Sequence, residues 1–121
     1  VSLNAWRRRY RQLLNTLSAK FGVECVCVSG LPPLGRFPVL PKPLNRVLGE
    51  RAALFDRCLR ELALELPNVT YLPLDFELDT QNMASDGFHP GPEIYAAWAD
   101  RASTALEETL IQNESWQSHF N

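Results

Sequence analysis

An aspartate and a histidine three positions apart, Asp86 and His89, are the residues of this chain whose types and spacing could do chemistry. They lie within residues 85–91 (SDGFHPG), whose glycines and proline are typical of a tight turn. In such a turn the carboxylate can accept a hydrogen bond from the imidazole Nδ1–H, which fixes the tautomer and leaves Nε2 free as a base. The pair therefore predicts two of the three members of a Ser-His-Asp site.

Simpler interpretations of the same residues stay open. Asp86 could cap the helix that follows, His89 could be a turn residue near a helix N-terminus, or the two could be metal ligands. A metal site would need further ligands, and His119 lies near the end of a polar segment. We expect neither a metal nor a cofactor, and the residues that bind substrate stay unknown.

Length and charge restrict the class of protein. The 121 residues suffice for one domain and are too few for two. The net charge of -2 argues against non-specific binding to nucleic acid, and no apolar run reaches the roughly 20 residues of a membrane span. Because the chain opens with Val1 and shows no signal peptide, we expect it to start inside a longer protein.

The cysteines carry a weak signal about compartment. There are three of them, Cys25, Cys27 and Cys58, which is an odd number at low density. We therefore do not expect a disulfide framework. We expect buried free thiols instead. Free thiols favour a reducing compartment, so the localisation leans toward the cytoplasm.

Apolar periodicity divides the chain into five regular elements. The predicted order is a helix from Ser2 or Asn4 to about Gly22, a strand over 23–30, a helix over 44–66, a strand over 69–74, and a helix from Pro92 to about Leu110. We expect the first strand to be buried on both faces and the arginines of 7–11 to form a solvated helix face. Residues 31–43 carry five prolines and form a long loop of the kind that is often functional. Residues 112–121 are a polar tail.

Strands that alternate with helices predict parallel strands joined by right-handed crossovers. Two parallel strands make a poor sheet alone, because parallel sheets need cover on both faces and usually more strands. The fold class is therefore α/β, and the chain is expected to be the second half of a three-layer α/β/α sandwich, a single partial domain over residues 1–121.

The D-x-x-H-P block at 86–90, with Tyr95 and Trp98 on the helix after it, resembles the final block of the SGNH (GDSL-type) hydrolases. The strands 23–30 and 69–74 are similar to the penultimate and last strands of that flavodoxin-like fold. The resemblance implies that Asp86 is the catalytic acid and His89 the catalytic base of a serine ester hydrolase. It implies an acyl ester or a lipid as the substrate and no cofactor.

The chain departs from the family in the blocks that it lacks. The G-D-S-type block with the nucleophile is absent, and so are the glycine and the G-x-N-D asparagine that donate to the oxyanion. Ser29, at a strand end, is a weak substitute for the nucleophile. We therefore expect a C-terminal half that is inactive alone. Its partners would be an ester substrate and either a second copy of the chain or the missing N-terminal half. The alternative is a non-catalytic α/β module that dimerises or binds a partner through its open sheet edge.

Overall fold

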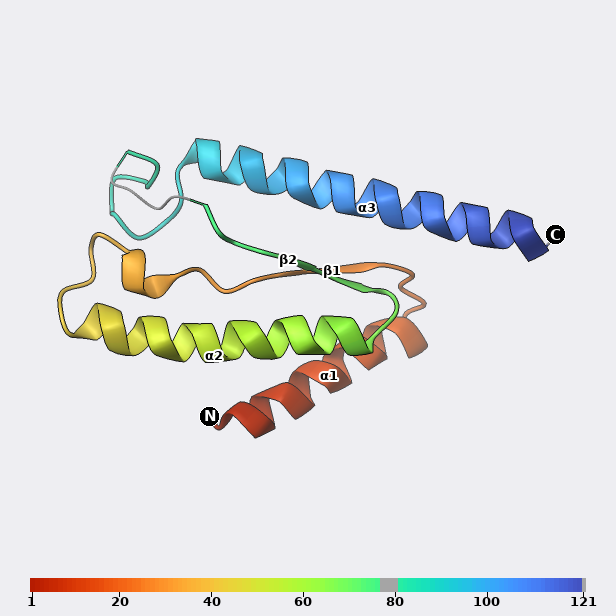
Figure 1. Ribbon diagram of the computed structural model, residues 1–121, viewed down its shortest axis with the longest axis horizontal. Coiled ribbons are helices and arrows are strands. Elements are labelled where there is room, and N and C mark those ends of the chain that lie inside the picture. Colours follow the sequence, from red (N-terminus) through yellow and green to blue (C-terminus); the bar gives the residue numbers. More distant parts are fainter. Residues whose placement is uncertain (77–80, 121) are drawn as a thin grey trace.

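The computed structural model describes residues 1–76 and 81–120, with side chains up to Gln112. Its elements, in chain order, are α1 (Leu3–Ala19), β1 (Val26–Ser29), the 3-10 helix η1 (Leu34–Arg36), α2 (Leu44–Glu65), β2 (Val69–Leu72) and α3 (Pro92–Phe120) (Figure 1). The predicted order helix, strand, helix, strand, helix is confirmed. The described residues form an α/β unit with three long helices and a two-stranded sheet.

Local sequence signals set the ends of the helices. The Ser2 hydroxyl accepts a hydrogen bond from the Ala5 N–H at 3.2 Å and caps α1, as the sequence predicts. Gly22, just past α1, has a φ of 65°, a left-handed conformation that glycine adopts at little cost. α2 ends before Pro67, which cannot continue a helix.

The two strands pair in parallel over a short register, from Val26 opposite Val69 to Ser29 opposite Leu72. Both are shorter than predicted. Residues 23–25 lie outside the register, because the second strand only reaches the sheet at Asn68, whose carbonyl accepts from the Val26 N–H at 2.9 Å; the Val23 N–H donates to the Leu17 carbonyl instead. At the other end, Pro73 has no N–H with which to extend the ladder.

A sheet cluster of buried side chains joins α1 and α2 to one face of the strands. It consists of Leu14 from α1, Val28 from β1, Leu59 from α2 and Val69 from β2. The half-buried side chains around it are Trp6, Tyr10, Val26, Leu31, Ala63, Leu66 and Tyr71. Successive strand residues point to opposite faces, so Val28 and Tyr71 mark the side that these two helices cover.

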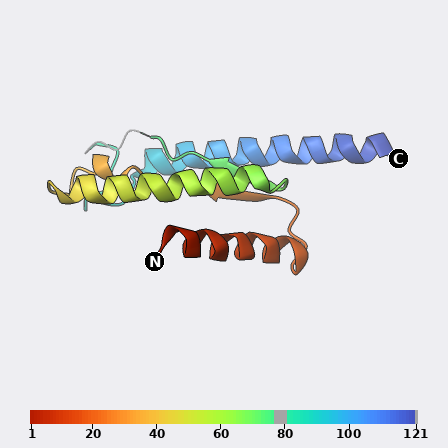
Figure 2. The same cartoon turned by 60° about the horizontal axis from the view of Figure 1, so that its bottom comes forward.

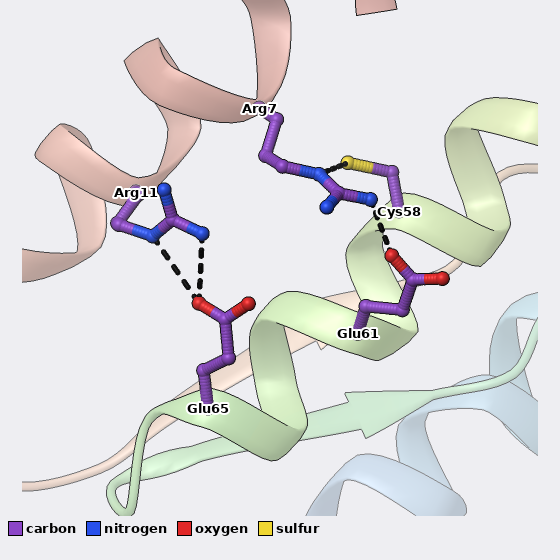
Figure 3. A network of polar contacts seen from close by, with 5 residues as sticks. All are labelled: Arg7, Arg11, Cys58, Glu61 and Glu65. Atoms are coloured by element: carbon purple, nitrogen blue, oxygen red, sulfur yellow. Dashed lines mark hydrogen bonds and ion pairs between the residues drawn. The ribbon is translucent and has the colours of Figure 1, made fainter. Parts of the chain in front are cut away.

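A polar network closes the interface between α1 and α2 (Figure 3). Arg7 pairs with Glu61 and also donates from Nε to the Cys58 thiol at 3.1 Å, while Arg11 pairs with Glu65 at 2.8 Å. The expected solvated face of arginines is therefore corrected in part. Two of its members bind carboxylates of α2, because α1 crosses over that helix.

α3 contacts the other face of the sheet, where the Trp98 indole N–H donates to Ser29 Oγ at 3.1 Å. Figure 2 shows α1 on the opposite side of the strands from α3. On this face Leu72 of β2 is buried, whereas Cys27 and Ser29 of β1 are only half-buried and Val28, on the opposite face, is the buried residue of β1. The expectation of a strand buried on both faces, with Cys25 and Cys27 fully inside, is thus wrong.

The C-terminal segment is helical. α3 continues to Phe120, so the predicted polar tail prolongs the helix from Gln112 onward, and the side chains after Gln112 lie outside the described residues. None of the helices, over the part of the chain that the structure describes, is long and apolar enough to cross a membrane.

Candidate active site

The Asp-His turn, defined as residues 82–91, follows β2 and leads into α3 at the carboxyl end of both strands (Figure 1). Its ends are joined by an antiparallel bridge between Met83 and Pro90. The Gly91 N–H donates to the Asn82 carbonyl at 2.7 Å, and the Ala84 N–H donates to the His89 carbonyl at 2.7 Å. Backbone bonds therefore close the turn on itself.

Two glycines allow this closure. Gly87 has a φ of 69°, in the left-handed region that other residues rarely adopt. At Gly91 a Cβ would lie 2.6 Å from the Asn82 carbonyl oxygen, which is too close for any side chain. The turn can bring its residues together because these two positions carry no side chain.

Asp86 holds the turn and the histidine at once. Its Oδ1 accepts from the backbone N–H groups of Phe88 and His89, both at 2.9 Å, and its Oδ2 lies 2.5 Å from His89 Nδ1. These contacts hold the pKa of the Asp86 carboxyl well below its usual range, first through the imidazole and then through the two N–H groups. An ionised carboxylate only accepts, so Nδ1 carries the proton and Nε2 is left as the acceptor.

The imidazole is accessible. The His89 side chain is 68 % exposed, and the Asp86 side chain about half exposed. A base that must reach a proton on another group needs this access. The geometry is that of an exposed imidazole oriented through its Nδ1 by Asp86.

The simpler interpretations can now be compared with this geometry. Asp86 does not cap α3, because that helix begins at Pro92 and the Asp86 carboxylate binds N–H groups inside the turn instead. As for metal ligation, the described residues contain no group of three or more His, Cys, Asp or Glu side chains that could hold an ion. His119 belongs to the part of α3 whose side chains are not described.

Ser29 does not join this pair. Its hydroxyl accepts from Trp98, and its own nearest acceptor is the Gly30 carbonyl at 3.4 Å. No hydrogen bond links Ser29 to His89, both of which are among the described residues. The structure therefore brings together Asp86 and His89 and leaves Ser29 at the sheet.

A second polar group, which sequence reasoning missed, fixes the chain where it leaves β1. Asp56 Oδ1 accepts from the Leu31 N–H at 3.0 Å and from the Tyr71 hydroxyl at 2.6 Å, while Oδ2 pairs with Arg60. Desolvation and the bond to Asp56 raise the pKa of Tyr71. The aspartate lies between two pockets of about 290 and 200 Å³ that flank the start of the loop 31–43. No local motif in the sequence predicts this contact; only the order of the helices and strands along the chain indicates it.

A turn cluster of buried side chains consists of Phe37 from the loop, Met83 from the Asp-His turn and Ile94 from α3. Leu34, Leu40 and Phe76 are partly buried against it. Arg101 of α3 binds the residues that follow β2. It donates to the Pro73 carbonyl and pairs with Asp75, and its guanidinium carbon lies 4.3 Å from the centroid of the Phe76 ring. Arg101 thereby keeps the pKa of Asp75 below its usual value.

The fold and the pair define an α/β protein with a polar site beyond the carboxyl ends of parallel strands, which is where α/β sheets commonly carry their sites. The model of the GDSL-like lipase/acylhydrolase family matches residues 2–102, and the chain belongs to that family of ester hydrolases. The matched range includes the Asp-His turn, Tyr95 and Trp98. Searches of curated proteins and of solved structures found no match.

Proposed function

We propose that Asp86 and His89 are the acid and the base of a serine ester hydrolase. The observation that carries this is the 2.5 Å contact between Asp86 Oδ2 and His89 Nδ1, in a turn whose backbone N–H groups also bind the carboxylate. An ionised, backbone-held Asp orients the imidazole and stabilises the imidazolium when it forms. Membership of the GDSL-like family supports an ester or a lipid as the substrate.

The proposed reaction is acyl transfer to water. A serine hydroxyl adds to the ester carbonyl carbon while His89 Nε2 takes its proton. The tetrahedral intermediate then breaks its bond to the alcohol oxygen, which receives that proton from His89. A water molecule repeats the sequence on the acyl-enzyme, releasing the acid and the free serine.

We further propose that the serine and the oxyanion donors come from a part of the protein that precedes these residues. The blocks that carry them in SGNH hydrolases do not occur in this sequence. The two-stranded sheet, with α1 and α2 on one face and α3 on the other, supports the view that the chain is the C-terminal part of a three-layer flavodoxin-like sandwich. In this view residues 1–121 are one partial domain.

The test compares the chain alone with the chain extended by its upstream coding sequence, on short p-nitrophenyl esters. We expect no hydrolysis above background from the chain alone, because nucleophile and oxyanion hole are lacking. In the extended protein, His89→Ala should lower kcat/KM by about six orders of magnitude. Ser103→Ala, an exposed position on α3, is the matched control. Undiminished hydrolysis by the His89→Ala protein would refute the proposal.

A second candidate function, a non-catalytic module that self-associates or binds a partner, is favoured by one observation. Along β2, a shallow apolar pocket of about 430 Å³ is lined by residues that include Leu64, Val69 and Tyr71, and Leu64 is 88 % exposed. Open strand edges are templates for pairing with another chain. Sedimentation distinguishes the two: a monomer that unfolds cooperatively argues against a module that needs a partner at this edge.

A further inference from the structure

We propose that Phe37, in the proline-rich loop 31–43, is a positioning residue that orients the His89 imidazole through the ring of Phe88. This inference rests on the proposed function of Asp86 and His89. It deepens that function by naming a contact, in addition to the carboxylate, that holds the base in place.

The first step is that Phe37 is itself fixed. Its side chain is 6 % exposed and packs with Met83, from the start of the turn, and Ile94, from the first turn of α3. One buried cluster therefore joins a residue of the loop, a residue of the Asp-His turn and a residue of α3. A close-packed ring of this kind has little freedom to move.

The second step leads from Phe37 to the histidine. The ring of Phe88 meets the ring of Phe37 edge to face, at 5.4 Å between centroids and 86° between planes. The same ring meets the His89 imidazole at 5.8 Å between centroids and 73° between planes. Such edge-to-face pairs are favourable beyond the area they bury, so Phe88 transmits the position of Phe37 to His89.

The third step is the need for this contact. Asp86 holds the imidazole by a single hydrogen bond at Nδ1, and the side chain is mostly exposed. One hydrogen bond leaves the ring able to pivot about that bond, which would move Nε2. A second contact, from the Phe88 ring, restricts that pivot.

The backbone makes the same connection at a neighbouring point. A Cβ placed on Gly87 would lie 3.4 Å from the Val39 Cβ, so the loop and the turn run in contact there. Phe37 and Val39 in the loop thus meet Phe88 and Gly87 in the turn. Loop 31–43 therefore packs against the Asp-His turn at these two points.

The experiment observes the histidine itself by NMR in this chain. Phe37→Leu keeps a buried apolar side chain and removes the ring edge. We expect the His89 Nδ1–H resonance to broaden and move upfield as its bond to Asp86 weakens, and the pKa of the Asp86 carboxyl to rise toward its usual value. Met83→Leu, in the same cluster but without a ring contact to Phe88, is the matched control and should change neither signal.

A second variant keeps the inference falsifiable if Phe37→Leu does not fold. Phe88 is 47 % exposed, so Phe88→Ala is compatible with folding and should give the same two changes. In the Phe88→Ala background, Phe37→Leu should add nothing further, because the ring that connects the two is gone. Unchanged His89 and Asp86 signals in folded Phe37→Leu or Phe88→Ala would overturn the inference, as would equal changes in Met83→Leu.

The catalytic readout separates this inference from the function on which it rests. In the extended protein, Phe37→Leu should lower kcat by about 10-fold with little change in KM, as expected for a displaced catalytic group. If His89→Ala leaves hydrolysis intact, the proposed function fails whatever the NMR signals show. If His89→Ala abolishes hydrolysis and Phe37→Leu moves neither the NMR signals nor kcat, only the positioning role fails.

Discussion

The sheet cluster and the turn cluster are both buried and apolar, but they are built from different parts of the chain. The sheet cluster takes one residue from each of α1, β1, α2 and β2, all of them regular elements. The turn cluster takes Phe37 and Met83 from irregular segments and only Ile94 from a helix. The first cluster joins elements to one another, whereas the second joins a loop to a turn.

We infer that the two clusters stabilise different parts of the molecule. Loss of a side chain from the sheet cluster separates helices from strands, so it acts on the whole fold. Loss from the turn cluster acts on the Asp-His turn. Among the described residues, the backbone bonds that close the turn join residues of the turn itself, so we expect it to open as a local unit. Three changes, given from the largest expected effect to the smallest, test whether the clusters stabilise different parts.

The largest effect is expected in the sheet cluster. Leu59→Ala removes a side chain that is 3 % exposed and belongs to one cluster with residues of three other elements. The free energy of unfolding should fall by about 2 to 5 kcal/mol, measured by urea denaturation. A loss below about 1 kcal/mol would mean that the sheet cluster is not the part that holds the fold together.

A smaller and more local effect is expected at Gly91. In Gly91→Ala the new Cβ would meet the Asn82 carbonyl oxygen at 2.6 Å, so the backbone pair that closes the turn must separate. We expect about 1 to 3 kcal/mol of local destabilisation, seen as faster amide exchange at Ala84 and residue 91.

Gly35→Ala is the control for this prediction, because its Cβ would find an ordinary contact at 3.5 Å. Exchange at Ala84 should be unchanged in that variant. If Gly91→Ala accelerated exchange equally in the sheet strands, the turn would not be an independent unit.

The smallest effect is expected from pH. The folded-state pKa of Asp86 is lowered, so its carboxylate stabilises the turn above the usual carboxyl pKa of about 4, and this contribution is lost as the pH falls toward the lowered value. As the pH falls from about 4 toward the lowered value, the amide exchange of Phe88 and His89, relative to their intrinsic rates at each pH, should become faster while that of the sheet cluster stays unchanged. In Asp86→Asn this acceleration should be absent.

The regular elements and the Asp-His pair could be predicted from the sequence because their signals are local. α2 was expected over 44–66 and spans Leu44–Glu65, since its apolar residues repeat with the helical period and Pro67 ends it. Asp86 and His89 are three positions apart, so a turn alone brings them together. Family membership, which the D-x-x-H-P block indicated, agrees with the match over residues 2–102.

The contacts that the sequence did not reveal join residues far apart in the chain. Phe37 lies in a proline-rich loop whose apolar residues show no helical or strand period. Its partner Phe88 comes 51 positions later in the sequence. Arg7 and Arg11 looked like solvated residues because their acidic partners are on another helix. Periodicity also overestimated burial: Val47 has the spacing of an apolar face and is 59 % exposed, since no element of the described chain covers it.

Cys58 offers a way to watch one of these interfaces open. Its thiol is 1 % exposed and receives the Arg7 Nε–H from α1 (Figure 3). An alkylating reagent can reach the sulfur only after α1 has swung away from α2, whereas the half-buried Cys25 and Cys27 need no such movement. The labelling rate of Cys58 relative to the other two thiols therefore measures how often α1 detaches from α2.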